Sequence, residues 1–544
     1  MKLIIVFISF SFITFAQGMY EPVDSDIYKY LETLSIKGII TFDNEIKPLL
    51  RIEIAKKLLE TNSQSLHLTE FEKELLSFYD QDFKHEINLI KNNFQHDIKP
   101  EFIITENENR IRLFEFAGKD FSFFADPMLS FSEQSIAGEN LFVRRNGFSF
   151  YGYAFNNWAY SLNFFDNEES GNNLDITKEL TLERGTSVTK IKEDAFEYDQ
   201  VNASVGYYWS NGSISLGKEN FNIGNGENGK IILNYKAPSF PYIRLDYKPV
   251  DWLRFFYFHG FLVSNVPDSS TYRYSQVDDR NSISDIPKFI ALHTLSLYPV
   301  ANFSFTIGES IVYSENIQPI YLIPVMFFRV ADHYLSRDNG SASGNAQIFM
   351  DASYINKYVK SKFYGSLFVD EFSFNSIFEG GNLSALGYTL GIETADLAFN
   401  NSSIGLEYTR VNPFVYMNSV DAQQFTNDSY NLGHWIGSNS DIVSIKYQQY
   451  FMRSLRLTLK TWYFRKGKNE LPEDQYTTPY PEFLYGEKRY EFGIDIRIKY
   501  RPWHPVVLEG YYSFMNITDE FDGRTLDYKL SDNHYFGAAI SYGF

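Results

Sequence analysis

Residues 491–500, EFGIDIRIKY, alternate apolar and polar side chains along their whole length. Successive side chains of a β-strand point to opposite faces of its sheet, so this spacing predicts a strand with one apolar and one polar face. The polar face carries both signs of charge, on Glu491, Asp495, Arg497 and Lys499. Such a strand suits a sheet with one apolar face and one face that meets water or a network of ion pairs.

The same two-residue period recurs elsewhere in the chain. In residues 455–460 leucines alternate with Arg456, Thr458 and Lys460, and in residues 244–248 the charged side chains share one face. The last stretch alternates in the same way and ends on Phe544. A terminal strand with a final aromatic residue is typical of outer-membrane barrels.

We predict eighteen strands, joined alternately by short and long connections. The short ones, such as 210–212 and 452–453, are typical of periplasmic turns, and the others run from 11 to 32 residues, as extracellular loops do. The longest of these are 167–198, 314–344 and 412–440. The predicted strands cover residues 120–132, 144–154, 157–166, 199–209, 213–219, 241–248, 252–263, 286–297, 302–313, 345–354, 361–372, 384–396, 402–411, 441–451, 454–465, 488–500, 505–516 and 533–544.

A soluble β-sandwich also alternates apolar and polar residues, so alternation alone does not decide the fold. The sorting of connections into short and long, together with mixed charge on the polar faces, favours an antiparallel transmembrane β-barrel. An even number of strands places both ends of the barrel on the periplasmic side, next to the N-terminal segment. The fold class that we predict is mainly β, an eighteen-stranded barrel with a small periplasmic helical bundle.

The N-terminus predicts export. Met1-Lys2 is a short positive start, residues 3–12 are almost entirely apolar, and Thr14-Phe15-Ala16 offers small residues for cleavage before Gln17. Residues 1–16 are therefore a predicted signal peptide. No later segment holds 18 consecutive apolar residues, so a barrel is the structure left to span a membrane. We expect the mature protein in the outer membrane.

The segment that follows predicts helices. Apolar residues recur at helical spacing in residues 25–34 and 51–60, and Thr69 with Glu72 forms a capping box before another apolar run. These helices make a predicted periplasmic bundle over residues 17–110, and the barrel is predicted over residues 111–544.

Composition excludes several classes of protein. The chain of 544 residues has no cysteine, which rules out disulfides, thiolate metal sites and cysteine catalysis. Its formal charge of −19 argues against nucleic-acid binding. Aromatic residues make up 18% of the chain, and a barrel uses many of them in girdles at the two membrane interfaces.

The sequence holds no visible catalytic constellation. A Gly-x-Ser-x-Gly motif is absent, and no nucleophile stands with a base, so we predict a protein that is not an enzyme and needs no cofactor or metal. The long loops mix aromatics, amides and charges, which suit the apolar faces and hydroxyls of sugars. They are equally typical of ordinary extracellular loops. The candidate glycan-binding residues are Tyr430, His434, Trp435, Asn439, Lys218 and Glu219.

Several motifs, in their order along the chain, resemble the capsule assembly (Wzi) family of outer-membrane proteins. In residues 216–226 the resemblance is incomplete, because Ile223 and Asn225 stand where members often carry tryptophan and proline. The resemblance implies an eighteen-stranded barrel with a periplasmic helical bundle and a lectin-like role in anchoring capsular polysaccharide. The matching stretches are residues 30–40 (YLETLSIKGII), 48–55 (PLLRIEIA), 216–226 (LGKENFNIGNG), 407–413 (EYTRVNP) and 432–441 (LGHWIGSNSD).

Three functions remain open. The first is a non-enzymatic lectin whose partners are capsular polysaccharide or exopolysaccharide, outer-membrane lipid and lipopolysaccharide, acting as a monomer. The alternative is a diffusion channel for a sugar or another small solute, because an eighteen-stranded barrel is wide enough for an aqueous pore unless side chains and loops fill it. The charges predicted to face the lumen, such as Arg244, Asp246 and Arg456, fit either an open pore or a salt-bridged plug. The third, an outer-membrane hydrolase, lacks a nucleophile–base pair.

Overall fold

The computed structural model describes residues 20–92, 100–106, 110–118, 120–136, 138–155, 157–275, 280–339, 344–371, 385–468, 471, 474 and 481–543. The predicted signal peptide lies outside these described residues and stays a prediction.

Eighteen antiparallel strands form a closed barrel, which confirms the predicted fold class and strand order. The sheet closes where β27 pairs with β4. The wall strands are β4 (Phe121–Ile136), β5 (Glu139–Ala154), β6 (Trp158–Gly171), β8 (Ala195–Trp209), β9 (Gly212–Glu219), β11 (Phe240–Val250), β12 (Leu253–Leu262), β15 (Lys288–Val300), β16 (Phe303–Ser314), β17 (Asn345–Asn356), β18 (Ser361–Glu371), β19 (Ala385–Ala395), β20 (Ser402–Val411), β23 (Ser440–Met452), β24 (Leu455–Lys466), β25 (Arg489–Trp503), β26 (Val506–Asp519) and β27 (Ser531–Tyr542).

One predicted long connection is wrong. Strands β4 and β5 cover residues 133–136 and 139–143 and pair as far as Ile136 and Glu139, so these residues are strand and not loop. Glu133, Ser135 and Asn140 take outward positions here beside the outward Phe142, so the apolar outward face that marks a membrane strand is interrupted before the strands end. Barrel strands that continue past the apolar band need not alternate.

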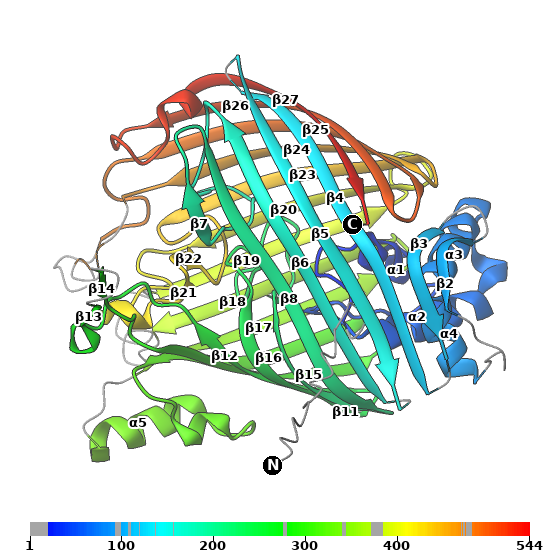
Figure 1. The fold of residues 1–544 in the computed structure, drawn as a ribbon, viewed down its shortest axis with the longest axis horizontal. Coiled ribbons are helices and arrows are strands. Elements are labelled where there is room, and N and C mark those ends of the chain that lie inside the picture. The colour runs from blue at the N-terminus through cyan, green and yellow to red at the C-terminus, as the bar shows by residue number, and fades with distance from the viewer. Residues whose placement is uncertain are drawn as a thin grey trace, which may run out of the picture.

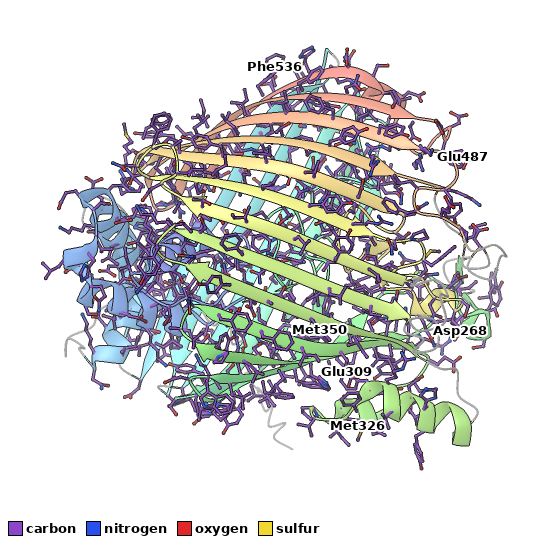
Figure 2. The ribbon with its side chains drawn as sticks, turned by 180° about the vertical axis from the view of Figure 1, so that it is seen from behind. Asp268, Glu309, Met326, Met350, Glu487 and Phe536 are labelled. Carbon is purple, nitrogen blue, oxygen red and sulfur yellow. The ribbon has the colours of Figure 1, made fainter. Side chains whose placement is uncertain are left out.

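The two faces of the wall separate apolar from charged side chains. On β24 Leu457 and Leu459 face outward, whereas Arg456 and Lys460 reach groups inside the barrel. On β27 the outward Phe536 is 56% exposed, and Figure 2 shows it at the outer surface. Similar exposed apolar residues recur around the barrel, including Phe131, Ile214, Leu390, Leu406, Ile445, Ile498 and Ile540. An apolar exterior is what a wall facing lipid requires.

Four helices gather at one end of the barrel, close to the C-terminus (Figure 1). They are α1 (Asp26–Ile36), α2 (Arg51–Ser63), α3 (Glu70–Asp82) and α4 (Lys84–Lys91), with the short η1 (Ser65–His67) between α2 and α3. The predicted capping box is present: the Thr69 hydroxyl accepts from the Glu72 amide at 3.2 Å, and the Glu72 carboxylate accepts from the Thr69 amide at 2.8 Å. The helices share their own apolar core, built around Leu31, Leu58 and Phe83.

A hairpin stands between the helices and the barrel. Strands β2 (Glu101–Glu106) and β3 (Arg110–Ala117) pair with each other, and β3 continues the sheet onto β4. The predicted division between residues 110 and 111 therefore coincides with the start of β3. As a domain boundary it stays a prediction.

Smaller elements lie in the connections, and several of them lie toward the end of the barrel opposite the helices (Figure 1). None of the helices in the described part of the chain combines the length and apolar character needed to cross a membrane. These elements are β1 (Ile46–Lys47), β7 (Val188–Ile191), β10 (Asn222–Ile223), η2 (Ser269–Thr271), β13 (Arg273–Ser275), β14 (Arg280–Ser282), η3 (Pro319–Leu322), α5 (Phe328–Asn339), η4 (Asp421–Gln423), β21 (Thr426–Asn427), β22 (Tyr430–Asn431) and η6 (Asp527–Lys529).

Candidate functional site

The barrel lumen contains chain from both ends of the barrel. Strand β1, from the N-terminal domain, pairs antiparallel with β10, from the connection between β9 and β11. The Gly224 amide adds a bond of 2.9 Å to the Glu45 carbonyl. The connection 412–439 joins the same assembly, because the Asn234 amide donates to the Leu432 carbonyl at 2.7 Å. We call this assembly of β1 and connections 220–239 and 412–439 the lumen plug.

An apolar core holds the lumen plug against the inner wall. It combines plug residues such as Ile231, Ile232 and Phe425 with inward residues of the wall strands such as Phe258 and Phe349, all of them fully buried. Burial of this kind is the main favourable contribution to packing, at about 25 cal/mol per Å² of apolar surface. The plug is therefore a packed interior and not a set of loops resting in an open channel.

Helix α1 is tied to the wall by ion pairs. Asp26, the first residue of α1, accepts from Arg456 at 2.8 Å and from Lys499 at 2.7 Å. Burial alone would raise the pKa of Asp26, but the cations Arg456 and Lys499 hold it well below its usual range. Farther along α1, Glu32 accepts from the wall residue Lys362 at 2.7 Å. The mixed charges that the sequence places inside the barrel thus form a salt-bridged plug.

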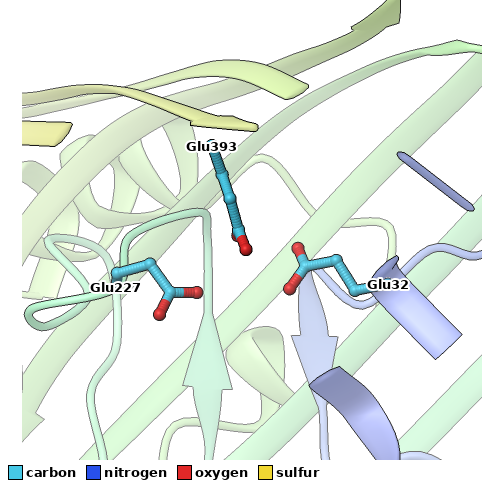
Figure 3. Close-up of side chains that lie close together, drawn as sticks. All are labelled: Glu32, Glu227 and Glu393. Carbon is cyan, nitrogen blue, oxygen red and sulfur yellow. The ribbon is translucent and has the colours of Figure 1, made fainter. Parts of the chain in front are cut away.

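Three carboxylates converge where α1, the plug and the wall meet. Glu32, Glu227 and Glu393 bring oxygen atoms within 4.8 Å of one another, and Figure 3 shows them pointing toward a common centre. Lys29 lies among them, at 2.5 Å from Glu393 and 3.2 Å from Glu227. Lys446 approaches Glu227 at 2.8 Å, and Lys362 binds Glu32.

The lysines decide the chemistry of this cluster. Burial would raise the pKa of Glu227, but Lys29 and Lys446 hold it well below its ordinary value, so its carboxylate is charged. Lys362 and Lys29 likewise lower the pKa of Glu32 to about 2 against the opposing effect of burial. Ammonium groups therefore take the place that a bound cation would need, and the cluster locks α1 to the plug.

A cavity with a mixed polar and apolar lining remains between the helices and part of the wall. Its volume is about 420 Å³, within the range of small-molecule sites. Amide and hydroxyl side chains line it together with charges of both signs, a lining that suits water or a small polar solute. The lining includes Asp126, Arg145, Ser161, Asn163, Gln200, Asn202, Glu219 and Glu509.

Three of the predicted glycan-binding residues lie inside the plug. Trp435 is 6% exposed, and its indole nitrogen donates to the Asn228 carbonyl at 2.6 Å. His434 is fully buried, and burial lowers the pKa of its imidazole to about 3. Asn439 is fully buried and accepts from the Leu484 amide at 2.7 Å. Because these side chains have almost no exposed surface, a polymer outside the cell does not reach them in this arrangement.

The other three candidates are not brought together. Lys218 and Glu219 are consecutive in a strand and point to opposite faces: Glu219 lines the internal cavity, and Lys218 follows the outward Leu216. Tyr430 lies at the extracellular end and is half-buried, with the Lys236 ammonium 5.7 Å from its ring centre. A glycan-binding role for these residues stays a prediction, and Tyr430 is the one whose position suits it.

Two exposed tyrosines that the sequence did not single out lie in a connection bonded to the one that carries Tyr430. Tyr272 and Tyr274 are 54% and 55% exposed in the connection between β12 and β15. That connection is bonded to the one that carries Tyr430, through Asn265 to Asp428 at 3.1 Å and to Ser429 at 2.8 Å. We call residues 265–274 and 428–430 the outer platform; residues 428–430 are also part of the lumen plug. Two tyrosines spaced by two residues were a usable signal, since such side chains share a face of an extended segment.

Comparison with known proteins identifies the family. The sequence profile described as capsule assembly protein Wzi matches residues 85–527, most of the chain. This protein belongs to the Wzi family. The resemblance predicted from the motifs is thereby confirmed, and the family and the closed barrel together indicate an outer-membrane location.

A solved structure of a Wzi protein shares the fold of this chain. Wzi from Escherichia coli, described as an outer-membrane protein involved in group 1 capsule assembly and a carbohydrate-binding β-barrel, superposes with a TM-score of 0.59 at 13% identity. The alignment covers 97% of this chain and 100% of that one. Two structures of OprD from Pseudomonas aeruginosa align over 77% of this chain and 94% or 93% of theirs, with TM-scores of 0.41 at 10% and 12% identity. Comparison with curated proteins gives no match.

Proposed function

We propose that this Wzi-family protein is a non-enzymatic, lectin-like protein that holds or organises capsular or surface polysaccharide. The observation that carries the proposal is the lumen plug, which is packed and ion-paired from both ends. A barrel built in this way offers its outer loops to a polymer. The description of the Escherichia coli relative as carbohydrate-binding supports the same role.

We infer that the glycan contacts the outer platform. Tyr272 and Tyr274 offer exposed rings on which the apolar C–H faces of a pyranose can stack. Tyr430 adds a third, half-buried ring, and Asn265 and Asp428 supply directional polar groups for hydroxyls. In this proposal Trp435 and His434 support the platform from below and do not touch the sugar.

The test compares two sets of tyrosine variants. The double variant Tyr272→Ala and Tyr274→Ala should lose at least tenfold in retention of the cell's own capsular polymer, measured by pull-down with purified protein and by capsule staining of cells. The matched control is Tyr358→Ala, because Tyr358 is 88% exposed but lies in the short turn between β17 and β18, at the opposite end of the barrel. Equal retention by the double variant and the control would refute the proposed surface.

The alternative function, a diffusion channel, is favoured by the internal cavity of about 420 Å³. Planar-bilayer recording separates the two functions, since a channel gives a steady open-pore current and a plugged barrel gives brief openings at most. Export through the predicted signal peptide, action as a monomer and contact with lipopolysaccharide complete the proposal. Mass spectrometry of the mature N-terminus checks the cleavage before Gln17.

A further inference from the structure

The long connection between β16 and β17 packs on the outside of the barrel. Residues of η3 and α5, including Tyr321, Phe328 and Ala331, are buried against wall residues Ile311 and Tyr313. These wall residues face outward, because their neighbours in β16 point into the lumen: Thr306 bonds the plug residue Glu45, and Val312 belongs to the lumen core. Figure 2 shows α5 and Met326 outside the barrel, beside the part of the wall that carries Glu309.

This part of the wall is polar and needs a cover. Glu309 faces outward from the middle of β16, yet it is only 4% exposed. Its carboxylate accepts from the Phe328 amide at 2.6 Å, at the start of α5, and lies 3.3 Å from His293 of β15. The outward Tyr257 donates to the Tyr321 carbonyl at 2.9 Å. A carboxylate facing lipid without such partners is costly, so η3 and α5 shield it.

The contact with Glu309 shows how far η3 and the start of α5 lie below the outer end of strand β16. Glu309 lies five residues below Ser314, the outer end of β16. At about 3.4 Å per residue that is about 17 Å along the strand, or about 13 Å along the barrel axis at a strand tilt of about 40°. The chain therefore descends beside the wall after Ser314, turns near Phe328 and returns through α5 to Asn345 at the start of β17.

The exposed residues of the segment are mostly apolar, with His333 of α5 exposed among them. Val325, Phe327, Val330 and Tyr334 are 77%, 62%, 64% and 59% exposed. The wall residue Ile307, next below Glu309 on the outward face of β16, is 37% exposed. The exposed side of the segment is thus continuous with the apolar exterior of the wall. Backbone bonds within it run from the Met326 amide to the Ile323 carbonyl at 3.0 Å and from the Ala331 amide to the Phe327 carbonyl at 3.0 Å.

We propose that residues 319–335 form a re-entrant hairpin that is embedded in the outer leaflet, with Val325, Phe327, Val330 and Tyr334 in contact with lipid acyl chains. The hairpin seals the polar pair Glu309–His293 away from lipid and gives the barrel an apolar lateral ridge. The occupant of its far side is acyl chain and not a second copy of the protein, because this side continues the lipid-facing wall.

Spin labelling tests the proposal, and the absence of native cysteine makes each label unambiguous. Val330→Cys and Phe327→Cys are labelled in the full chain in lipid vesicles. Ile307→Cys provides the lipid-facing reference. Asp522→Cys, at an exposed position in the connection between β26 and β27, provides the aqueous reference. All four positions are exposed, so the variants should fold as the parent does.

The expected result is that labels at 330 and 327 collide with molecular oxygen as often as the label at 307, within about twofold, and rarely with a water-soluble nickel complex. Nickel collisions at the frequency seen for position 522 would overturn the proposal. Dipolar broadening at position 330 that disappears on dilution with unlabelled protein would also overturn it, since a second copy would then cover the ridge.

Discussion

Neutralising Asp26 should release the N-terminal helices from the barrel. Asp26 is held by Arg456 at 2.8 Å and Lys499 at 2.7 Å, with Arg501 at 3.9 Å, and its side chain is 17% exposed. The substitution Asp26→Asn keeps the shape and removes the charge, which leaves the cations without their counter-ion. Breaking a buried pair in this way costs about 3–5 kcal/mol, and the partial exposure argues for the lower end, about 3 kcal/mol.

A loss of about 3 kcal/mol raises the undocked fraction about 100-fold, since every 1.4 kcal/mol is a factor of ten. We expect frequent current openings of Asp26→Asn in planar bilayers and faster proteolysis of the segment 20–92. The matched control is Asp24→Asn, because Asp24 is 59% exposed and pairs with Arg184 at 3.4 Å, a contact worth at most about 1 kcal/mol. If a folded Asp26→Asn barrel is as silent as the parent, the ion pairs do not hold the plug.

The Asp26 carboxylate makes the docking of the N-terminal helices on the barrel depend on pH. Its folded-state pKa lies well below the unfolded value of about 3.9, so the unfolded state binds more protons between the two values. The stabilisation is complete above about pH 4 and is lost as the pH falls through the lowered folded-state pKa. The parent should stay docked at pH 5, and its proteolysis should approach that of Asp26→Asn only in stronger acid.

Two further substitutions probe the lumen plug. Trp435→Ala should lower the unfolding free energy by about 3–5 kcal/mol, because it opens a cavity and leaves the Asn228 carbonyl without its donor. Urea unfolding measures this loss. A smaller loss of unfolding free energy than for Tyr430→Ala would contradict the buried position of Trp435. Burial lowers the pKa of Lys47 in β1 to about 7. Below pH 7 the folded protein must hold Lys47 charged, and this destabilises it. The loss of stability becomes smaller as the pH rises from 7 to about 10.4, the pKa of lysine in the unfolded chain. Lys47→Met should therefore raise the urea midpoint at pH 6 more than at pH 9, whereas Lys56→Met, at an exposed position of α2, should change neither; an equal shift at both pH values would contradict the assignment.

The barrel wall was predictable because the alternation of apolar and polar residues can be seen within each strand of the sequence. Alternation in residues 491–500 and 455–460 reports which side chains face lipid, and the order of short and long connections reports the direction of each strand. The rule fails at residues 133–143, where the polar Glu133, Ser135 and Asn140 occupy outward positions of β4 and β5. It also does not extend to η3 and α5, because Tyr321 and Phe328 pack on Ile311 and Tyr313 outside the barrel through contacts that strand alternation does not report.

The candidate site was less predictable because its contacts join distant parts of the chain. Trp435 and His434 have the composition of a sugar-binding loop, but the connection 220–239 folds against them and buries them. Nothing near Asp26 in the sequence indicates Arg456 or Lys499 as its partners. The mixed charge of the inner wall predicted that a salt-bridged plug was one outcome, and contacts between distant segments decided in its favour.

The pairing of β1 with β10 has a mechanical consequence. It joins backbone that enters the barrel from the helical end to backbone that enters from the opposite end, through Ile46 and Ile223. Force applied to the outer connections is therefore transmitted to the N-terminal segment through these hydrogen bonds as well as through the contacts of the plug with the wall. If the outer connections bind a polymer as proposed, force on that polymer would reach the N-terminal segment on the other side of the membrane through the lumen plug, inside the surrounding barrel wall.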